Sequence, residues 1–183
     1  FEDTWPLPRY GMAVVIQDEF MYVFGGHDQA TGLPVNEMWR FDIANREWVL
    51  LPQAGPQPAP RSRHSMVAAG EDRLIMFGGF DFTFFSDTSS YFDDMWEYDI
   101  PSQVWTQMSP GGIEQPVARR SQVIVADRTH IYMFGGEDEN EAPLGDLWAY
   151  QFAKLGPEIV SFVADDEDDA DTIYSNGDTM IIT

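Results

Sequence analysis

The chain has 183 residues, and because 44% of them are hydrophobic and 14% aromatic it can bury a sizeable core. Its 31 acidic and 10 basic side chains give a formal charge of -21, which argues against nucleic acid and anionic lipid as partners. The absence of cysteine excludes disulfides, thiolate nucleophiles and cysteine-ligated zinc, and no apolar run approaches the ~18 residues that a membrane-spanning helix needs.

Three similar units follow one another, at about 6–50, 58–107 and 116–153. Each has an arginine ahead of an apolar run: PRYGMAVVI from Pro8, RHSMVAA from Arg63 and RRSQVIVA from Arg119. A second apolar run then ends in two glycines and is followed by a tryptophan and, in the first two units, by another tryptophan nine residues later. The residues that define this pattern are Gly25, Gly26, Trp39, Trp48, Gly78, Gly79, Trp96, Trp105, Gly135, Gly136 and Trp148.

Each unit offers four short apolar or alternating runs separated by Gly, Pro, Asp and Asn, which predicts a four-stranded antiparallel sheet. The runs YVF, IMF and YMF are continuous, as in strands buried on both faces between stacked neighbours. We therefore predict an all-β fold, a partial β-propeller of three four-stranded blades. The order of arginine, apolar strand, Gly-Gly, aromatic-aspartate strand and spaced tryptophan closely resembles kelch repeats, so residues 1–156 are interpreted as kelch propeller blades.

The ends of this repeat region are irregular. Where a second tryptophan is due in the third unit, residues 151–155 run into Gly156 and Pro157, so that blade either lacks its outer strand or receives it from another segment. Trp5 precedes PRY as Trp48 precedes PAPRSR, and we interpret it as the end of a preceding blade. Three blades leave two apolar faces open, so we expect further blades of the same chain or, less favoured, another subunit to complete the ring.

Residues 157–183 do not follow the repeat pattern; they predict a strand IVSFVA, an acidic loop, a turn SNGD and a strand TMIIT. This segment predicts the start of a second, acidic β module or a linker. It resembles the opening of β-sandwich repeats in large surface or secreted proteins, which implies a domain boundary at residues 155–157 and an extracellular or cell-surface location. A cytoplasmic location is the alternative. Because the chain begins at Phe1 and ends inside an apolar run, we expect it to be part of a longer polypeptide.

The acidic loop is the densest set of oxygen ligands in the chain, and oxygen is what calcium prefers. The candidate calcium ligands are Asp165, Asp166, Asp168, Asp169 and Asp171. The loop lacks the glycine and glutamate spacing of an EF-hand, and a solvated acidic linker is the favoured interpretation. No other cofactor is predicted.

No constellation of catalytic residues is visible. His27, His64 and His130 lie at different positions of different units, so they do not form a zinc pair, and His64 is interpreted as a packing residue. The G-x-S-x-G pattern of serine nucleophiles is absent. Some kelch propellers are copper radical oxidases, but these need a cysteine-modified tyrosine that this chain cannot form. We predict that it is not an enzyme.

Arginines recur just before the first strand of each unit and allow two interpretations. They could form an anion-binding ring at one mouth of the propeller. Alternatively, each pairs with a carboxylate or backbone carbonyl of a neighbouring blade, for which the planar guanidinium is suited, and this structural interpretation is favoured. The arginines are Arg9, Arg61, Arg63, Arg119 and Arg120.

One connection is unusually aromatic. In the stretch GGFDFTFFSDTSSYFDD, 14 residues separate Gly79 from Asp94, against nine between Gly136 and Asp146. Its alternating phenylalanines predict an extended hairpin arm with one apolar face. We consider two roles: an anchor for a protein partner, since aromatics dominate interface hot spots, or packing against the chain's own blades. The candidate partner-binding residues are Phe80, Phe82, Phe84, Phe85, Tyr91 and Phe92.

These observations favour a non-catalytic protein-interaction or scaffolding propeller within a larger, modular, extracellular assembly protein. Its partners are proteins: the remaining blades, another subunit, or further copies in a homo-oligomer or filament. The alternatives are an intracellular kelch substrate adaptor and an enzyme whose active site lies in blades outside this chain. No membrane insertion is predicted within this segment.

Overall fold

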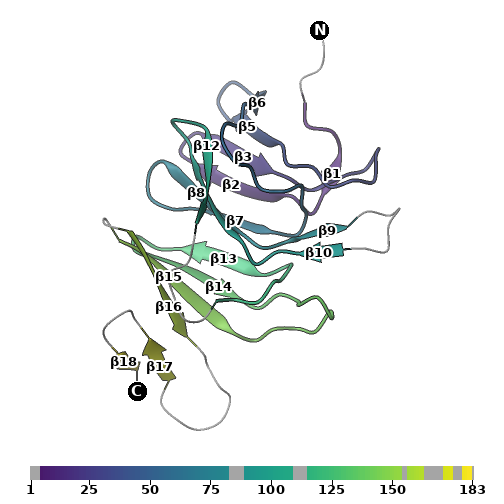
Figure 1. The fold of residues 1–183 in the computed structure, drawn as a ribbon. Helices are drawn as coiled ribbons and strands as arrows, with labels where there is room; N and C mark the ends of the chain where they lie inside the picture. Colours follow the sequence, from purple (N-terminus) through teal and green to yellow (C-terminus); the bar gives the residue numbers. More distant parts are fainter. Residues whose placement is uncertain are drawn as a thin grey trace.

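The computed structural model describes residues 5–82, 89–108 and 115–153, together with strands at 156–162, 171–174 and 179–182. Within these ranges every regular element is a β-strand (Figure 1). The strands form three antiparallel sheets that stack like a fan, and two short hairpin-like pairs lie at one end of the stack. We call the three sheets blades 1, 2 and 3.

Blades 1 and 2 are four-stranded meanders, and each repeat supplies one of them. Blade 1 has the order β2-β3-β5-β6, with strands β2 (Ala13–Gln17), β3 (Phe20–Phe24), β5 (Met38–Asp42) and β6 (Glu47–Leu51). Blade 2 has the equivalent strands β7 (Ser65–Ala68), β8 (Arg73–Phe77), β11 (Met95–Asp99) and β12 (Val104–Met108). The predicted four-stranded blades are thus confirmed, with the Gly-Gly strand second from the inside.

Blade 3 continues beyond its fourth strand. Its strands are β13 (Val123–Ala126), β14 (His130–Phe134), β15 (Leu147–Ala153) and β16 (Gly156–Phe162), followed in the same sheet by β17 (Asp171–Tyr174) and β18 (Thr179–Ile182). The segment after Gly156 therefore supplies the outer strand of the third unit, through a register that runs from Leu147 opposite Phe162 to Ala153 opposite Gly156. The boundary predicted at residues 155–157 includes the beginning of β16 at Gly156. A separate module beyond it stays a prediction, as does the role of Trp5, which is exposed and lies outside any strand.

The two short pairs sit beyond the Gly-Gly turns. Strand β1 (Arg9–Tyr10) pairs with β4 (His27–Asp28), and β9 (Phe80–Phe82) pairs with β10 (Ser89–Tyr91). The second pair forms the arm that projects from blade 2 in Figure 1, so the predicted hairpin arm is confirmed.

Two apolar seams hold the blades together. The seam between blades 1 and 2 buries Ala13, Val15, Tyr22, Phe24, Met38, Leu51, Met66, Leu74, Met76, Trp96, Tyr98 and Trp105. The seam between blades 2 and 3 buries Ala69, Ile75, Phe77, Met95, Ile131, Met133 and Tyr150. Alternate residues of β8 enter different seams, because side chains along a strand point to opposite faces. This confirms that the run IMF of blade 2 is buried on both faces, and YVF of blade 1 is buried as well. The prediction is wrong for YMF of blade 3, because Phe134 is 54% exposed on a face that no described blade covers.

Each glycine of the blade 2 pair lies against backbone or side-chain atoms that leave no room for a Cβ, those of blade 3 at Gly78 and those of blade 2 itself at Gly79. Gly78 has φ +67°, and a Cβ there would lie 2.7 Å from the carbonyl oxygen of Arg119. Gly79 has φ +92°, and its Cβ would lie 2.7 Å from the Cβ of His64. Both positions thus combine a left-handed backbone with a close approach that only glycine permits. Gly135, at the equivalent place in blade 3, has φ +69° but nothing closer than Leu144 O at 3.3 Å.

Each seam is also bridged by an arginine. The Arg61 side chain is fully buried, and it donates hydrogen bonds to both carboxylate oxygens of Asp94, at 2.5 and 2.8 Å, and to the Gly78 carbonyl at 3.0 Å. Asp94 also accepts the indole N–H of Trp96 at 2.7 Å. The Arg61 carbonyl accepts the N–H of Gly26 from blade 1 at 2.9 Å. One residue therefore ties the Gly-Gly turns of two neighbouring blades.

The same network recurs in the other blades. Arg119 pairs with Asp146 through two bonds of 2.6 Å, and Arg9 pairs with Glu37 at 2.7 Å. Burial opposes ionisation of Asp146, but hydrogen bonds from Arg119 and Trp148 outweigh it and hold the pKa of that carboxyl below its usual value. These three arginines are structural, as favoured above, although their carboxylate partners lie in the same blade and not in a neighbouring one.

Candidate functional site

A pocket of about 300 Å³ opens at the end of the stack that carries the Gly-Gly turns, and all three blades contribute to it. We call it the mouth pocket. Its lining residues are Tyr10, His27, Ser62, Arg63, Phe80, Phe82, Arg120 and Glu141. The pocket follows from the repeat, because the residue after each structural arginine pairs with the residue after each glycine pair. The pairs are Tyr10 with His27, Ser62 with Phe80 and Arg120 with Glu137.

One wall of the mouth pocket is aromatic. Tyr10 stacks on His27 with ring centroids 5.3 Å apart, and His27 lies 6.3 Å from Phe82. Phe82 in turn lies 6.1 Å from Phe80, which contacts Tyr91 at 5.6 Å. These rings join blade 1 to the hairpin arm of blade 2 and provide aromatic side chains of the kind that anchor interfaces.

Two arginines lie against this wall. The guanidinium of Arg120 sits 4.7 Å from the centre of the Phe80 ring and forms ion pairs with Glu137 at 3.1 Å and Glu141 at 2.9 Å. The guanidinium of Arg63 lies 5.6 Å from the centre of the same ring, and Arg63 is exposed. Within the described ranges no carboxylate forms an ion pair with Arg63.

The backbone of Arg63 is held in an uncommon conformation. Its φ is +53°, whereas glycine occupies the equivalent turn in blade 1, Gly11, and serine the one in blade 3, Ser121. The N–H of Arg63 donates to the Gly11 carbonyl at 2.6 Å, and the Arg63 carbonyl accepts the Ser121 N–H at 2.8 Å. Left-handed non-glycine residues are infrequent and tend to occur at functional sites. The backbone of Arg63 thus lies between the equivalent turns of blades 1 and 3.

The aromatic residues predicted from the sequence divide into three groups. Phe80 and Phe82 line the mouth pocket, where Tyr91 packs against Phe80, and Phe80 is only 6% exposed. The ring centre of Phe92 lies 4.0 Å from the guanidinium carbon of the buried Arg61, so Phe92 packs against the arginine network within the blade. Phe84 and Phe85 lie outside the described residues. Partner binding by this arm stays a prediction.

The predicted calcium ligands cannot be placed together. Asp165, Asp166, Asp168 and Asp169 lie outside the described residues, and Asp171 begins β17. Among the residues that are described, no group of three or more His, Asp or Glu side chains is arranged to hold a metal ion. The same part of the chain contains no helix long and apolar enough to cross a membrane. Calcium binding stays a prediction.

His64 is a packing residue. It is 5% exposed, lies edge-on to Phe24 with ring centroids 5.4 Å apart, and touches the space that a side chain at Gly25 or Gly79 would need. Burial, together with the nearby Arg61 cation, lowers the pKa of His64 to about 3. The imidazole is therefore neutral at pH 7 and enclosed by the seam.

A pH dependence of stability follows from His64. The pKa of His64 falls from 6.5 in the unfolded chain to about 3 in the folded chain. Between these pH values His64 is protonated in the unfolded chain but not in the native chain. The free energy of unfolding therefore falls as pH decreases. From pH 7 to pH 5 this linkage amounts to a loss of about 2 kcal/mol. Urea unfolding at both pH values should show this loss in the native chain and its absence in His64→Leu. An equal pH slope in both proteins would contradict it.

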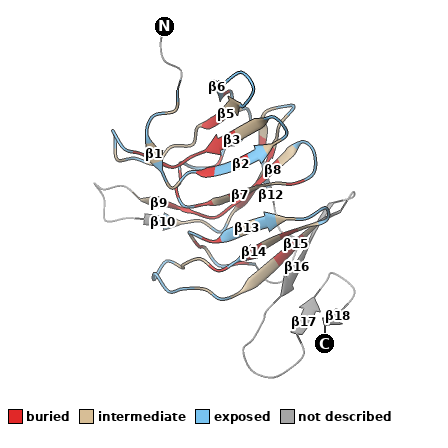
Figure 2. Cartoon of the chain, turned by 180° about the vertical axis from the view of Figure 1, so that it is seen from behind, coloured by how far each residue is buried: buried red, intermediate tan, exposed pale blue. Residues whose placement is uncertain are grey.

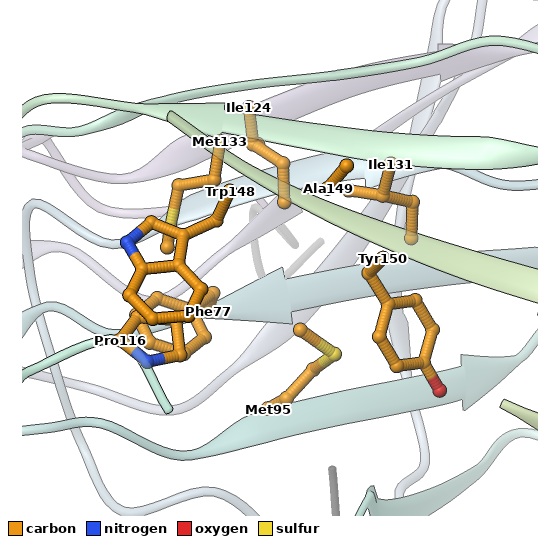
Figure 3. A pocket seen from close by; sticks show the side chains of 9 residues that line it. All are labelled: Phe77, Met95, Pro116, Ile124, Ile131, Met133, Trp148, Ala149 and Tyr150. Carbon is orange, nitrogen blue, oxygen red and sulfur yellow. The ribbon is translucent and has the colours of Figure 1, made fainter. Parts of the chain in front are cut away.

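A second, smaller cavity lies within the seam between blades 2 and 3 and has a volume of about 20 Å³ (Figure 3). Its walls are entirely hydrocarbon, aromatic and thioether groups, without a converging polar atom. The lining residues are Phe77, Met95, Pro116, Ile124, Ile131, Met133, Trp148, Ala149 and Tyr150. It is a packing defect of the seam, too small for a ligand.

Sequence reasoning missed most of the mouth pocket. Tyr10, Ser62 and Glu141 carry no motif of their own, and Arg63 and Arg120 were grouped with the structural arginines. The available signal was position: in the second and third units the first of two arginines enters the blade network, whereas residues that follow it line the mouth.

Comparison with known proteins agrees with this architecture. The model of the KLHDC2/KLHL20/DRC7 Kelch-repeats domain matches residues 1–157. The chain belongs to the kelch-repeat family. This confirms the kelch resemblance of the repeat region, whereas an extracellular modular parent protein is not addressed by the match.

Individual relatives are moderately similar to this chain in sequence. The chain is 32% identical over 136 residues to the leucine-zipper-like transcriptional regulator 1 homolog of Drosophila melanogaster, covering 74% of this chain and 13% of the relative. It is 31% identical over 159 residues to Kelch domain-containing protein 10 of Xenopus tropicalis, covering 80% and 36%. The solved structure of YjhT superposes with a TM-score of 0.70 at 15% identity, covering 90% of this chain and 54% of YjhT. This kelch domain therefore spans only part of each protein that it resembles.

Proposed function

We propose that this kelch domain is a non-catalytic interaction module that binds a protein partner through the mouth pocket, and that it receives a peptide segment presenting a carboxylate beside an apolar side chain. The observation that carries the proposal is Arg63, an exposed cation fixed over an aromatic ring in a chain of formal charge -21. A guanidinium recognises carboxylates with directed, charge-assisted hydrogen bonds. The aromatic wall of Tyr10, His27 and Phe82 provides the adjacent apolar contact.

The overall charge restricts the partner further. The acidic surface repels a uniformly acidic partner at long range, but at physiological salt charges more than about 8 Å apart are largely screened. A local carboxylate can therefore reach Arg63, while the surrounding surface of the partner should be neutral or basic. Membership of the kelch family supports protein binding in general, and the finer statement about the carboxylate rests on the pocket alone.

The test is a matched pair of arginine substitutions. Peptides are selected by display against the immobilised native chain, and their dissociation constants are measured by fluorescence polarisation. Arg63→Ala should weaken binding by about 10- to 100-fold, because a hydrogen-bonded charge contributes about 1.5–3 kcal/mol. The control is Arg46→Ala, since Arg46 is also exposed with positive φ, +59°, but lies in the turn between β5 and β6. Equal binding by Arg63→Ala and the native chain would refute the pocket as the site.

The setting of this module is a further part of the proposal. We infer an extracellular or cell-surface assembly protein from residues 157–183, of which the structure describes parts of three strands. An intracellular substrate adaptor is the alternative. Protease treatment of intact cells that express the full-length protein distinguishes them, since only a surface protein is cleaved.

A further inference from the structure

The mouth pocket carries a second exposed charge, opposite in sign to that of Arg63. Glu141 lies in the loop between β14 and β15. Figure 2 shows this loop at the same end of the stack as β1 and the β9–β10 arm, with its tip in the colour of exposed residues. The Glu141 side chain lines the pocket and is 73% exposed. The pocket therefore presents one cation and one carboxylate to solvent.

The charge of Arg120 is compensated without Glu141. Glu137 accepts hydrogen bonds from Nε and Nη2 of Arg120, at 3.2 and 3.1 Å, and the Arg120 side chain is only 11% exposed. Glu141 adds a single bond of 2.9 Å, from the same Nη2 to its Oε1. Its other oxygen, Oε2, accepts no hydrogen bond from the part of the chain that the structure describes. A negative charge is thus left facing the pocket.

The backbone of Glu141 has a conformation that glycine adopts in the equivalent loop of blade 1. Each loop forms a bridge between the residue after its glycine pair and a proline, Pro34 or Pro143, and the left-handed residue lies two positions before that proline. In blade 1 this residue is Gly32, with φ +67°, and in blade 3 it is Glu141, with φ +61°. A side chain in this conformation is destabilising, and such residues tend to occur at functional sites.

Arg63 shows the same replacement with the opposite charge. It has φ +53° where blade 1 has Gly11. Both exposed charges of the pocket therefore stand in left-handed conformations in which blade 1 has glycine. Glycine would adopt either angle without strain, so the turns themselves do not require these side chains. This favours a role for Arg63 and Glu141 within the pocket.

The loop that carries Glu141 is held by its own hydrogen bonds. The Glu141 N–H donates to the Asp138 carbonyl at 3.0 Å, and the Asp138 carboxylate accepts the N–H groups of Asn140 at 2.8 Å and Ala142 at 2.9 Å. A group that is already positioned loses less conformational entropy when a ligand binds. The loop thus presents the Glu141 carboxylate in a defined place.

We propose that the peptide segment bound in the mouth pocket carries a basic side chain beside its carboxylate, and that Glu141 receives this cation while Arg63 receives the carboxylate. This inference rests on the proposed function and adds a second charge to the ligand. The pocket of about 300 Å³ lies at the lower end of the range of about 300–1,000 Å³ for ligand sites, so one short segment can reach both charges. A purely acidic segment would meet Glu141 as a like charge and is disfavoured.

A double-mutant cycle between Glu141 and the peptide tests the contact. A randomised peptide library is selected on the native chain, and a binder whose affinity falls in Arg63→Ala is synthesised with its basic residue and with methionine in its place. Fluorescence polarisation gives the dissociation constants. Glu141→Gln should weaken the basic peptide by about 2- to 5-fold, the size expected for a partly exposed ion pair, and leave the methionine peptide unchanged. Peptides that depend on Arg63 but share no basic residue would overturn the inference.

The control is Glu139→Gln, since Glu139 is exposed in the same loop but does not line the pocket. It changes the net charge by the same amount and should leave both affinities near those of the native chain. Equal losses in the two variants would show that the long-range field of the acidic chain, and not a contact with Glu141, selects the cation. Glutamine keeps an oxygen that can accept from Arg120, and urea unfolding checks that each variant is folded.

The outcomes separate this inference from the proposed function. If Arg63→Ala weakens binding whereas Glu141→Gln affects both peptides alike, the carboxylate site is supported and the cation site is wrong. If no selected peptide depends on Arg63, the proposed function fails and this inference fails with it.

Discussion

Gly78→Ala should destabilise the fold by about 3 kcal/mol or more, whereas Gly135→Ala should cost only about 1–2 kcal/mol. The two glycines occupy the same position of the repeat with φ of +67° and +69°, so the strain of a left-handed alanine is common to both. They differ in what the new methyl group meets. At Gly78 it meets the Arg119 carbonyl at 2.7 Å, and at Gly135 the Leu144 carbonyl at 3.3 Å.

The difference between the two variants therefore isolates the contact between blades. A carbonyl within the Arg119 network cannot move without stretching its bond from the Gly79 N–H, which is 2.8 Å long. Urea unfolding followed by tryptophan fluorescence gives both free energies. Equal losses at the two positions would mean that backbone strain alone explains the glycines.

The repeat made the blades predictable from the sequence. Each blade has an apolar strand, a left-handed turn with two glycines and a tryptophan on the following strand, and each of these features strongly restricts the residue type. Gly78 shows why, since both the backbone angle and the Arg119 carbonyl of the neighbouring blade exclude a side chain. Repetition in three units then separated this pattern from chance.

Strand β16 and the mouth pocket could not be predicted from the sequence, because neither requires particular residue types. Strand β16 replaces a strand marked by tryptophan in the other blades, and almost any apolar segment can add its backbone hydrogen bonds to the edge of β15. The mouth pocket depends on which residues of three distant turns meet. Tyr10, Ser62 and Arg120 are equivalent in position but not in chemistry, so nothing in their residue types indicates that they share a site.

The arginines show how position changes the role of one residue type. Arg61 and Arg63 lie two residues apart, yet the first is fully buried in a carboxylate fork and the second is exposed at the mouth. The turn between them, with Arg63 at φ +53°, sends the two side chains in different directions. A stabilising element and a candidate recognition element are thus coupled through one short segment.

Arg61→Met should be the most destabilising single change in the network, with a loss of about 3–5 kcal/mol, because it leaves a partly enclosed carboxylate without its cation. Arg61 also donates to the Gly78 and Ala59 carbonyls and lies over the Phe92 ring at 4.0 Å. The carboxylate that loses its partner is Asp94, whose side chain is 16% exposed. Unfolding in urea measures the loss.

The matched control is Arg73→Met, since Arg73 forms a 3.3 Å ion pair with Glu97 in which the side chains are 38% and 25% exposed. Such a pair contributes about 0–1 kcal/mol, so that variant should remain close to the native chain. Arg61→Lys separates charge from geometry: a lysine keeps the cation but cannot form the two parallel bonds to Asp94, and an intermediate loss is expected. If Arg61→Met and Arg73→Met were equally stable, the buried fork between Arg61 and Asp94 would add no more to the stability of the fold than a surface ion pair does.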